Sequence, residues 1–523
     1  MTVRKFTGVQ KASGAEIRGI TWFSCFLLGL ALHLFVFTNL IPNSDGLSRM
    51  YELQQMTISG RWFLHYASVF HGFLQAPALI GMLTLLFLSF AAMLAADLLE
   101  VRRIPTAFAV GASFVMIPAL AYTFLFTFTA SAYGFAVLMA VASVWLVRKK
   151  KHGWIPGAVL LACSLGTYQA YFAVAASLAL MRVLMDLLDP EKKVGATVRA
   201  GLRLLLMLAA ATVLYAVILL VFLKVKNLEL VEYRGMKSVA GGLAIGETVR
   251  NVLRAVKQVL VYFVLPAGAF SSMPLTLAHW VYLLMAVAAG VFILVQKKLW
   301  KEPLRLLLLV VGAGLLPLAF NFTRVLSDTS PNMCYSFLLV YVLCALLLET
   351  AELPRRETVT KVTAAVFAVI LLINAQICSR AYLSSATAHR ATQTFVTNLV
   401  GRVESMEGYR SDMQVLIVGA MPREVYHTSS DLFEPTEHAS CTADTLLLRN
   451  KHIYYYLNDW LNIPWQEPAE ETLIAVSESA EFQDMPLYPD DGSIRIDGDT
   501  VIVKLAEEYT PKKPYEIAYE NRR

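Results

Sequence analysis

The sequence lacks the motifs that would indicate nucleotide or metal chemistry. Neither GxGxxG nor GxxxxGK(S/T) occurs in it, which argues against a nucleotide-driven pump. His65 and His71 have no carboxylate at ligand spacing, so we predict no metal site and no cofactor. The cysteines show no CxxC or His-flanked spacing, and therefore support neither a zinc site nor a disulfide framework. They are Cys25, Cys163, Cys334, Cys344, Cys378 and Cys441.

Charged residues make up only 16% of the chain, whereas hydrophobic residues make up 57%. The mean hydropathy is +0.56, and runs of about 20 apolar residues recur along the chain. This composition predicts a polytopic α-helical membrane protein, because a helix satisfies its own backbone hydrogen bonds in lipid. The net charge of +6 is explained by lysines and arginines in the loops, and we expect no nucleic-acid partner.

About eleven transmembrane helices are expected. The N-terminus has no small-residue cleavage site and its apolar run is too long for a signal peptide, so the first run is a span. Basic segments alternate with the other loops, which places the N-terminus in the cytoplasm and the C-terminus outside. The spans are 20–41, 73–94, 104–121, one ending at RKKKHGW, a short fifth and a sixth within 154–182, then 204–223, 279–295, 304–320, 333–348 and 359–378.

The chain changes character after the last apolar run. We expect a transmembrane domain over residues 1–379 and a small extracytoplasmic α/β domain over residues 380–523. In the second domain, Ser384 to Met406 has helical periodicity and QVLIVG at 414–419 is typical of a buried strand. SIRIDGDTVIVK at 493–504 alternates around an Asp-Gly turn and predicts a hairpin.

A long outward loop at 224–278 contains an amphipathic segment. Between Glu247 and Leu265, apolar residues share one helical face, and Arg250, Arg254 and Lys257 lie on the opposite side. This pattern predicts a helix lying in the membrane interface.

Asp45 is the candidate catalytic residue. It lies just beyond the first span, in the polar segment that starts at Ile41. It has two interpretations: an N-cap of a juxtamembrane helix after Pro42, or a general base that takes a proton from an attacking hydroxyl. One carboxylate could serve both roles.

Three arginines in outward loops are candidates for binding a phosphate. Arg49 and Arg61 follow Asp45, and Arg324 lies in the NFTRVLSD loop with Asp328. They can anchor the loops to lipid phosphates, or stabilise the charge that develops on a phosphate leaving group. Asp328 is expected to pair with Arg324.

Tyr168, Gln169 and Tyr171 form a polar and aromatic patch where the short fifth and sixth helices meet, with the break predicted at Gly166 to Gln169. Hydrogen bonding between helices and contact with a sugar are both consistent with such side chains. His33 lies inside the first span without an acid nearby in the sequence, which is weak support for a proton path.

Four of these features together resemble a known family. A basic N-terminus, a first span ending in the acidic motif NSDGLSR, Gly60-Arg61-Trp62 before the second span, and GTYQAYF resemble the bacterial glucosyltransferases of the Gtr type II family. These enzymes modify O-antigens and related surface glycans. The resemblance covers roughly the first 380 residues. It implies a C-type glycosyltransferase fold, a polyprenyl-phosphate sugar donor and an acid in the first outward loop. The family tends to have paired acids there, whereas here Ser44 precedes Asp45.

The sequence therefore predicts an inverting hexosyltransferase at the outer face of the bacterial cytoplasmic membrane. It would transfer glucose from undecaprenyl phosphate to a hydroxyl of a surface polysaccharide or teichoic-acid-like polymer. The expected partners are the lipid-linked donor, the glycan acceptor, membrane lipids, a polyprenyl-phosphate glycosyltransferase that makes the donor, and a small flippase.

Two alternatives remain at this point. One is a flippase or transporter of lipid-linked oligosaccharides, and the other is a glycan polymerase or ligase acting on diphosphate-linked substrates. The large outward loop and the folded outward domain favour an enzyme, and we find no symmetric halves of the kind that transporters show.

Overall fold

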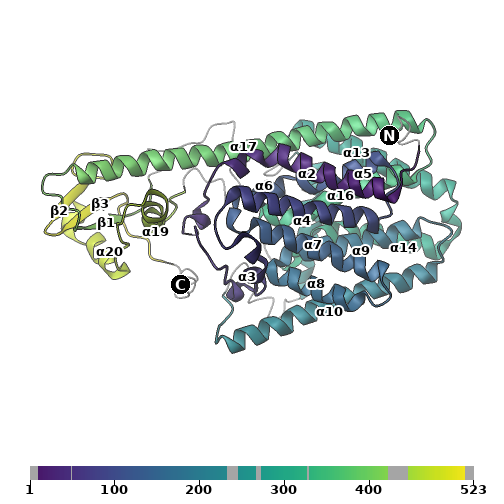
Figure 1. Ribbon diagram of the computed structural model, residues 1–523, viewed down its shortest axis with the longest axis horizontal. Coiled ribbons are helices and arrows are strands. Elements are labelled where there is room, and N and C mark those ends of the chain that lie inside the picture. Colours follow the sequence, from purple (N-terminus) through teal and green to yellow (C-terminus); the bar gives the residue numbers. More distant parts are fainter. Residues whose placement is uncertain are drawn as a thin grey trace.

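The computed structural model describes residues 10–48, 50–231, 245–266, 272–326, 329–421 and 446–512. A bundle of long helices and a smaller C-terminal part lie along one axis, joined by a single very long helix (Figure 1). The bundle helices are α2 (Gly14–Thr38), α4 (Pro77–Leu98), α5 (Ile104–Met116), α6 (Pro118–Leu125), α7 (Thr127–Lys149), α8 (Trp154–Thr167), α9 (Phe172–Leu187), α10 (Val194–Val225), α13 (Met273–Gln296), α14 (Pro303–Phe320), α16 (Leu338–Thr350) and α17 (Arg356–Glu404).

The prediction of a polytopic helical membrane protein is confirmed. Within the described residues, nine helices are long and apolar enough to cross a membrane, and a tenth is reached if α5 and α6, bent by 40°, count as one span. The bend falls at Pro118, because proline has no N–H to donate and holds Ile117 in extended backbone. The remaining predicted span, the short fifth, is the 14-residue α8.

The predicted break between the fifth and sixth helices is also present. Tyr168 adopts extended backbone after α8, and the turn η4 (Gln169–Tyr171) leads into α9. Gly166 is required here because a Cβ atom on it would lie 2.5 Å from the indole of Trp62. The indole of Trp62, from the first loop, therefore packs against the backbone at this break.

The basic loops meet at one end of the bundle. Arg102 N–H donates to Glu349 Oε1 at 2.8 Å, and Arg305 Nη1 donates to the carbonyl of Asp189 at 2.7 Å. The buried Asp186 pairs with Arg182 and, at 2.7 Å, with Arg148. The loops that are basic in the sequence therefore lie together at one end of the bundle, where hydrogen bonds and ion pairs join them. We call the opposite end, which carries residues 39–76, the loop end.

The amphipathic segment forms α12 (Ile245–Val264). Val249, Leu253 and Leu260 are exposed on one face, at 54%, 65% and 48%, whereas Ala255 and Phe263 are buried against the bundle. The sequence pattern placed Phe263 on the same helical face as Val249 and Leu253, whereas the structure buries it. An exposed apolar face beside charged residues suits a helix lying at a membrane surface.

α17 continues where two separate helices were expected. Its 49 residues include the predicted span at 359–378 and all but the last two residues of the predicted helix at 384–406. No glycine or proline lies between these two segments, so nothing in the chain ends the helix. The predicted domain boundary after residue 379 falls inside α17, which runs from the bundle into the C-terminal part (Figure 1).

The C-terminal part contains a three-stranded sheet in the order β1-β3-β2. β1 (Gln414–Val418) pairs in parallel with β3 (Thr500–Lys504), which forms the predicted hairpin with β2 (Ile494–Asp497). One face of the sheet packs on α17, and the other packs on α20 (Glu470–Ser477) and α21 (Ala480–Gln483). α19 (Asn450–Tyr455) and a π-helical turn at Tyr456–Trp460 lie on the side that faces the bundle (Figure 1).

Candidate active site at the loop end

Asp45 lies in a short turn between the bundle and the C-terminal part. The turn η1 (Ser44–Gly46) is capped by Asn43, whose Oδ1 accepts from the N–H of Gly46 at 2.7 Å. The side chain of Asp45 is exposed. Asn43 therefore takes the cap position that the sequence suggested for Asp45. The helix expected after Pro42 is not formed, because described residues 47–56 contain no helix.

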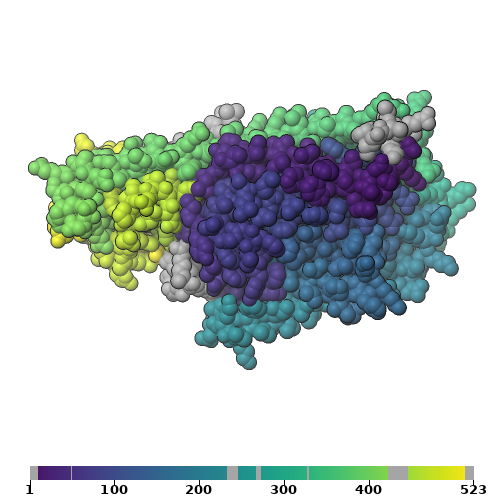
Figure 2. All heavy atoms as spheres, viewed as in Figure 1, coloured from purple at the N-terminus to yellow at the C-terminus, as the bar shows by residue number. Residues whose placement is uncertain are grey.

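The turn is held on both sides. A Cβ atom on Gly46 would lie 3.5 Å from the ring of Phe128 in α7, so this glycine packs closely on the bundle. Leu47 is fully buried in a cluster that also contains Leu399 of α17, and its carbonyl accepts from Trp460 Nε1 at 2.8 Å. The first loop, in purple, abuts the yellow-green C-terminal part in Figure 2. Asp45 is thus exposed on a backbone that is fixed at both ends.

Arg61 is anchored to aromatic side chains of the bundle. Its Nη1 donates to Tyr133 Oη at 3.2 Å, and its guanidinium lies 5.0 Å from the ring centroid of Tyr168. Tyr168 stacks on Tyr133 with ring centroids 4.4 Å apart, and Tyr171 packs edge-on against both rings. This arrangement fixes the cation at the loop end without placing it in bulk solvent.

The predicted sugar-binding patch packs inside the protein. Tyr168 and Tyr171 are only 4% and 2% exposed. Gln169 Nε2 donates to the carbonyl of Ser59 at 3.1 Å and to Tyr215 Oη at 3.0 Å. These are contacts between helices and the first loop, and direct contact of the three residues with sugar remains a prediction.

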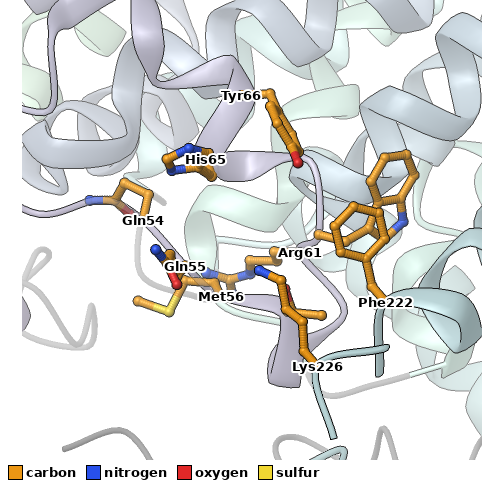
Figure 3. Close-up of a pocket in the computed structure, with 10 residues that line it drawn as sticks. Gln54, Gln55, Met56, Arg61, His65, Tyr66, Phe222 and Lys226 are labelled. Atoms are coloured by element: carbon orange, nitrogen blue, oxygen red, sulfur yellow. The ribbon is translucent and has the colours of Figure 1, made fainter. Parts of the chain in front are cut away.

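A cavity of about 120 Å³ opens beside Arg61. In Figure 3 the side chains of Arg61 and Lys226, the latter at the end of α10, point toward one another. None of the described residues that line the cavity is acidic, so the described lining is cationic. The lining residues are Gln54, Gln55, Met56, Thr57, Arg61, Trp62, His65, Tyr66, Phe222 and Lys226.

Two buried polar atoms of the lining residues have no hydrogen-bond partner among the described residues. They are Oε1 of Gln54, which is 1% exposed, and Nε1 of Trp62, which is 6% exposed. A buried polar atom without a partner costs about 1–3 kcal/mol. Both atoms are shielded from solvent, so what the cavity itself offers is the pair of cations, which suits an anionic group.

Other predicted site residues lie elsewhere. Arg324 is half-buried on α15 (Thr323–Leu326) and does not line the cavity. Arg49 and Asp328 lie outside the described residues. The expected pairing of Asp328 with Arg324 therefore also lies outside them. The described residues contain no group of three or more His, Cys, Asp or Glu side chains that could hold a metal ion. Sequence reasoning missed Gln54, although it lies in the same loop as Arg61. It also missed Lys226, because no local signal relates Lys226 to a loop so far away in the chain.

His71 connects the first loop to the bundle. Its buried imidazole also makes the stability of the folded protein depend on pH. Its Nδ1 lies 2.8 Å from Ser131 Oγ in α7, and burial lowers the pKa of His71 from 6.5 to about 4. The unfolded chain binds a proton more readily between these values, so stability is full above about pH 6.5 and falls toward pH 4. We expect lowering the pH from 7.5 to 5 to destabilise the parent by on the order of 1–2 kcal/mol more than His71→Asn.

Thermal unfolding of both proteins in detergent at the two pH values measures this difference. An equal pH dependence in the parent and in His71→Asn contradicts the assignment of the effect to His71.

Fold and site define a multi-pass membrane protein with an exposed acid and a cation-lined cavity at one end of its helical bundle. A family model described as glucosyl transferase GtrII matches residues 34–373, well over half of the chain. The chain belongs to this glucosyltransferase family, which confirms the resemblance seen in the sequence. No curated protein and no solved structure matches it significantly.

Proposed function

We propose that this protein transfers glucose from a polyprenyl-phosphate donor to a hydroxyl of a surface polysaccharide or teichoic-acid-like polymer. The observation that carries the proposal is the cavity in which the side chains of Arg61 and Lys226 converge. Two cations, with no acid among the described residues of the lining, suit the donor phosphate.

The reaction needs one base and one stabilised leaving group. The acceptor hydroxyl attacks the anomeric carbon, the bond from this carbon to the phosphate oxygen breaks, and the hydroxyl proton passes to Asp45. The direct displacement inverts the anomeric centre. Polyprenyl phosphate leaves with one more negative charge than it carried in the donor. Arg61 and Lys226 stabilise that charge as it develops, because they are already in place before the reaction.

The position of Asp45 is consistent with a site where the lipid-linked donor and the glycan acceptor come together. Its turn lies between the bundle and the C-terminal part. In the proposed reaction the bundle binds the lipid-linked donor and the C-terminal part binds the glycan acceptor. Arg324 is a further candidate for contact with the donor, on a different element from the cavity. The donor would be made by a separate polyprenyl-phosphate glycosyltransferase and moved outward by a small flippase.

The proposal places the loop end outside the bacterial cytoplasmic membrane, because the basic loops meet at the other end. We expect Asp491→Cys, an exposed site in the C-terminal part, to react with an impermeant thiol reagent in intact spheroplasts. The matched control is Lys151→Cys, at the basic end, which should react only after lysis. Both are made with Cys441 replaced by serine. The opposite labelling pattern contradicts the orientation and the mechanism with it.

A deletion strain distinguishes the proposal from its alternatives. Mass spectrometry of the surface glycans should show the loss of one glucose branch from an otherwise intact polymer. Loss of the whole polymer would indicate a polymerase, ligase or flippase, and unchanged glycans would contradict the proposed acceptor class. Re-expression of the parent chain should restore the branch, which excludes effects on neighbouring genes.

A further inference from the structure

Trp460 connects the C-terminal part to the turn that carries Asp45. It ends the π-helical turn at Tyr456–Trp460, and its Nε1 donates to the carbonyl of Leu47 at 2.8 Å. This is a side-chain hydrogen bond between residues 413 positions apart, made to the backbone two residues after Asp45. Irregular π-helical turns inside helices often occur at functional sites.

The indole of Trp460 is itself held in place by aromatic neighbours. Tyr456 stacks on it with an angle of 7° between the rings, and His389 of α17 meets it edge-on with centroids 5.5 Å apart. Leu47 is fully buried in the same cluster. The donor of the hydrogen bond and the backbone that accepts it are therefore both fixed, which is the condition for one group to position another.

We propose that Trp460 is a positioning residue for the transfer reaction, and that the C-terminal part sets the orientation of Asp45 through it. The inference rests on the proposed function, in which Asp45 is the base. On one side Gly46 packs on Phe128 of the bundle, and on the other Trp460 holds the carbonyl of Leu47. Without the indole N–H, the turn keeps its contact with the bundle and loses its fixed position relative to an acceptor on the C-terminal part.

The consequence is a loss in the chemical step and not in donor binding. The donor cavity is built from residues 54–66 and the end of α10, and neither Trp460 nor Leu47 lines it. Misplacing a reacting group by about 1 Å can cost roughly 100-fold in rate. Trp460→Phe keeps an aromatic ring in the cluster and removes only the donor. We expect it to lower kcat by on the order of 10-fold or more, with the KM for the donor unchanged.

The test is a double-substitution cycle on the full-length protein in lipid vesicles, with synthetic polyprenyl-phosphate glucose and the purified surface glycan. The variants are Trp460→Phe, Asp45→Asn and both together. The matched control is Trp465→Phe, which removes the buried indole of Trp465 from the cluster on which the half-buried Trp460 packs. If Trp460 acts through Asp45, Trp460→Phe lowers kcat in the parent and has no further effect in Asp45→Asn, whereas Trp465→Phe leaves kcat near the parent value.

Two results would overturn the inference while leaving the proposed function intact. One is an equal loss of kcat in the parent and in Asp45→Asn, which means that Trp460 acts independently of Asp45. The other is a Trp460→Phe protein with the kinetics of Trp465→Phe, which gives the tryptophan a structural role only. Parent-like activity of Asp45→Asn alone is a different result, and it overturns both the proposed base and the inference built on it.

Discussion

Asp45→Asn is expected to lower the transfer rate by roughly 100-fold or more while the protein stays folded and binds its donor. The substitution keeps the size and shape of the side chain and removes the proton acceptor. The cap of this turn is Asn43, so a loss of activity cannot be attributed to a lost cap at position 45. The rate is measured with purified protein, saturating donor and surface glycan, together with the midpoint of thermal unfolding.

Glu52→Gln is the matched control for this substitution. Glu52 is the other acid of the same loop, it is half-buried, and its backbone N–H donates to the carbonyl of Phe73 at 3.1 Å, a bond that the substitution retains. It should keep most of the activity. If Asp45→Asn works at the parent rate and Glu52→Gln is inactive, the base is Glu52 and the assignment of Asp45 is wrong.

Arg61→Ala is expected to have the second largest effect. If the guanidinium stabilises the phosphate that leaves, its removal should cost on the order of 2–4 kcal/mol of transition-state stabilisation, as for other preorganised donors. Arg61 also donates to Tyr133 and lies over Tyr168, so alanine removes structural contacts as well. Arg61→Lys is therefore measured beside it. Lysine keeps the charge but not the planar donor geometry, and should restore part of the rate.

The controls for Arg61 separate a phosphate contact from a lipid anchor. Arg254 of α12 is an exposed arginine that is also expected on the outer side, and Arg254→Ala should leave transfer unchanged. Lys226→Ala should lower transfer by less than Arg61→Ala, because its exposed ammonium is a flexible point charge. If Arg324→Ala proves more damaging than Arg61→Ala, the donor phosphate lies at α15 and not in the cavity.

Local patterns were sufficient to predict much of the fold. The apolar runs predicted the spans, and the segment around Gly166 to Gln169 predicted the break between α8 and α9. Asp497-Gly498 predicted the hairpin, in which Gly498 has a positive φ of 58°. The charge pattern of residues 247–265 predicted α12. In each case the signal lies within one element, so no knowledge of the tertiary structure was needed.

What the sequence could not predict depends on contacts between distant segments. Asn43 and Asp45 are both good caps, and only the geometry of the turn shows that Asn43 is the one used. Lys226 joins Arg61 at one cavity because α10 ends beside the first loop. Leu47 is an ordinary apolar residue in the sequence, yet it belongs to the hydrophobic cluster of the C-terminal part.

The candidate site shows the same division. Arg61 was predicted from its position after the first span, and the structure adds the cavity and the aromatic rings that hold it. Tyr168 and Tyr171 were candidates for sugar contact because tyrosines in a polar patch can either contact a sugar or form hydrogen bonds between helices. Their burial against Tyr133 is a property of the packed bundle and has no local signal.

The measurement that tests the central claim most directly is transfer by the purified protein in lipid vesicles. Radiolabelled glucose on synthetic polyprenyl phosphate is supplied with the surface glycan from a deletion strain, and the parent is compared with Asp45→Asn. Labelled glycan should form with the parent, with inverted anomeric configuration and release of polyprenyl phosphate, and should form at least about 100-fold more slowly with the variant. No transfer by the folded parent, or transfer with retained configuration, would contradict the account.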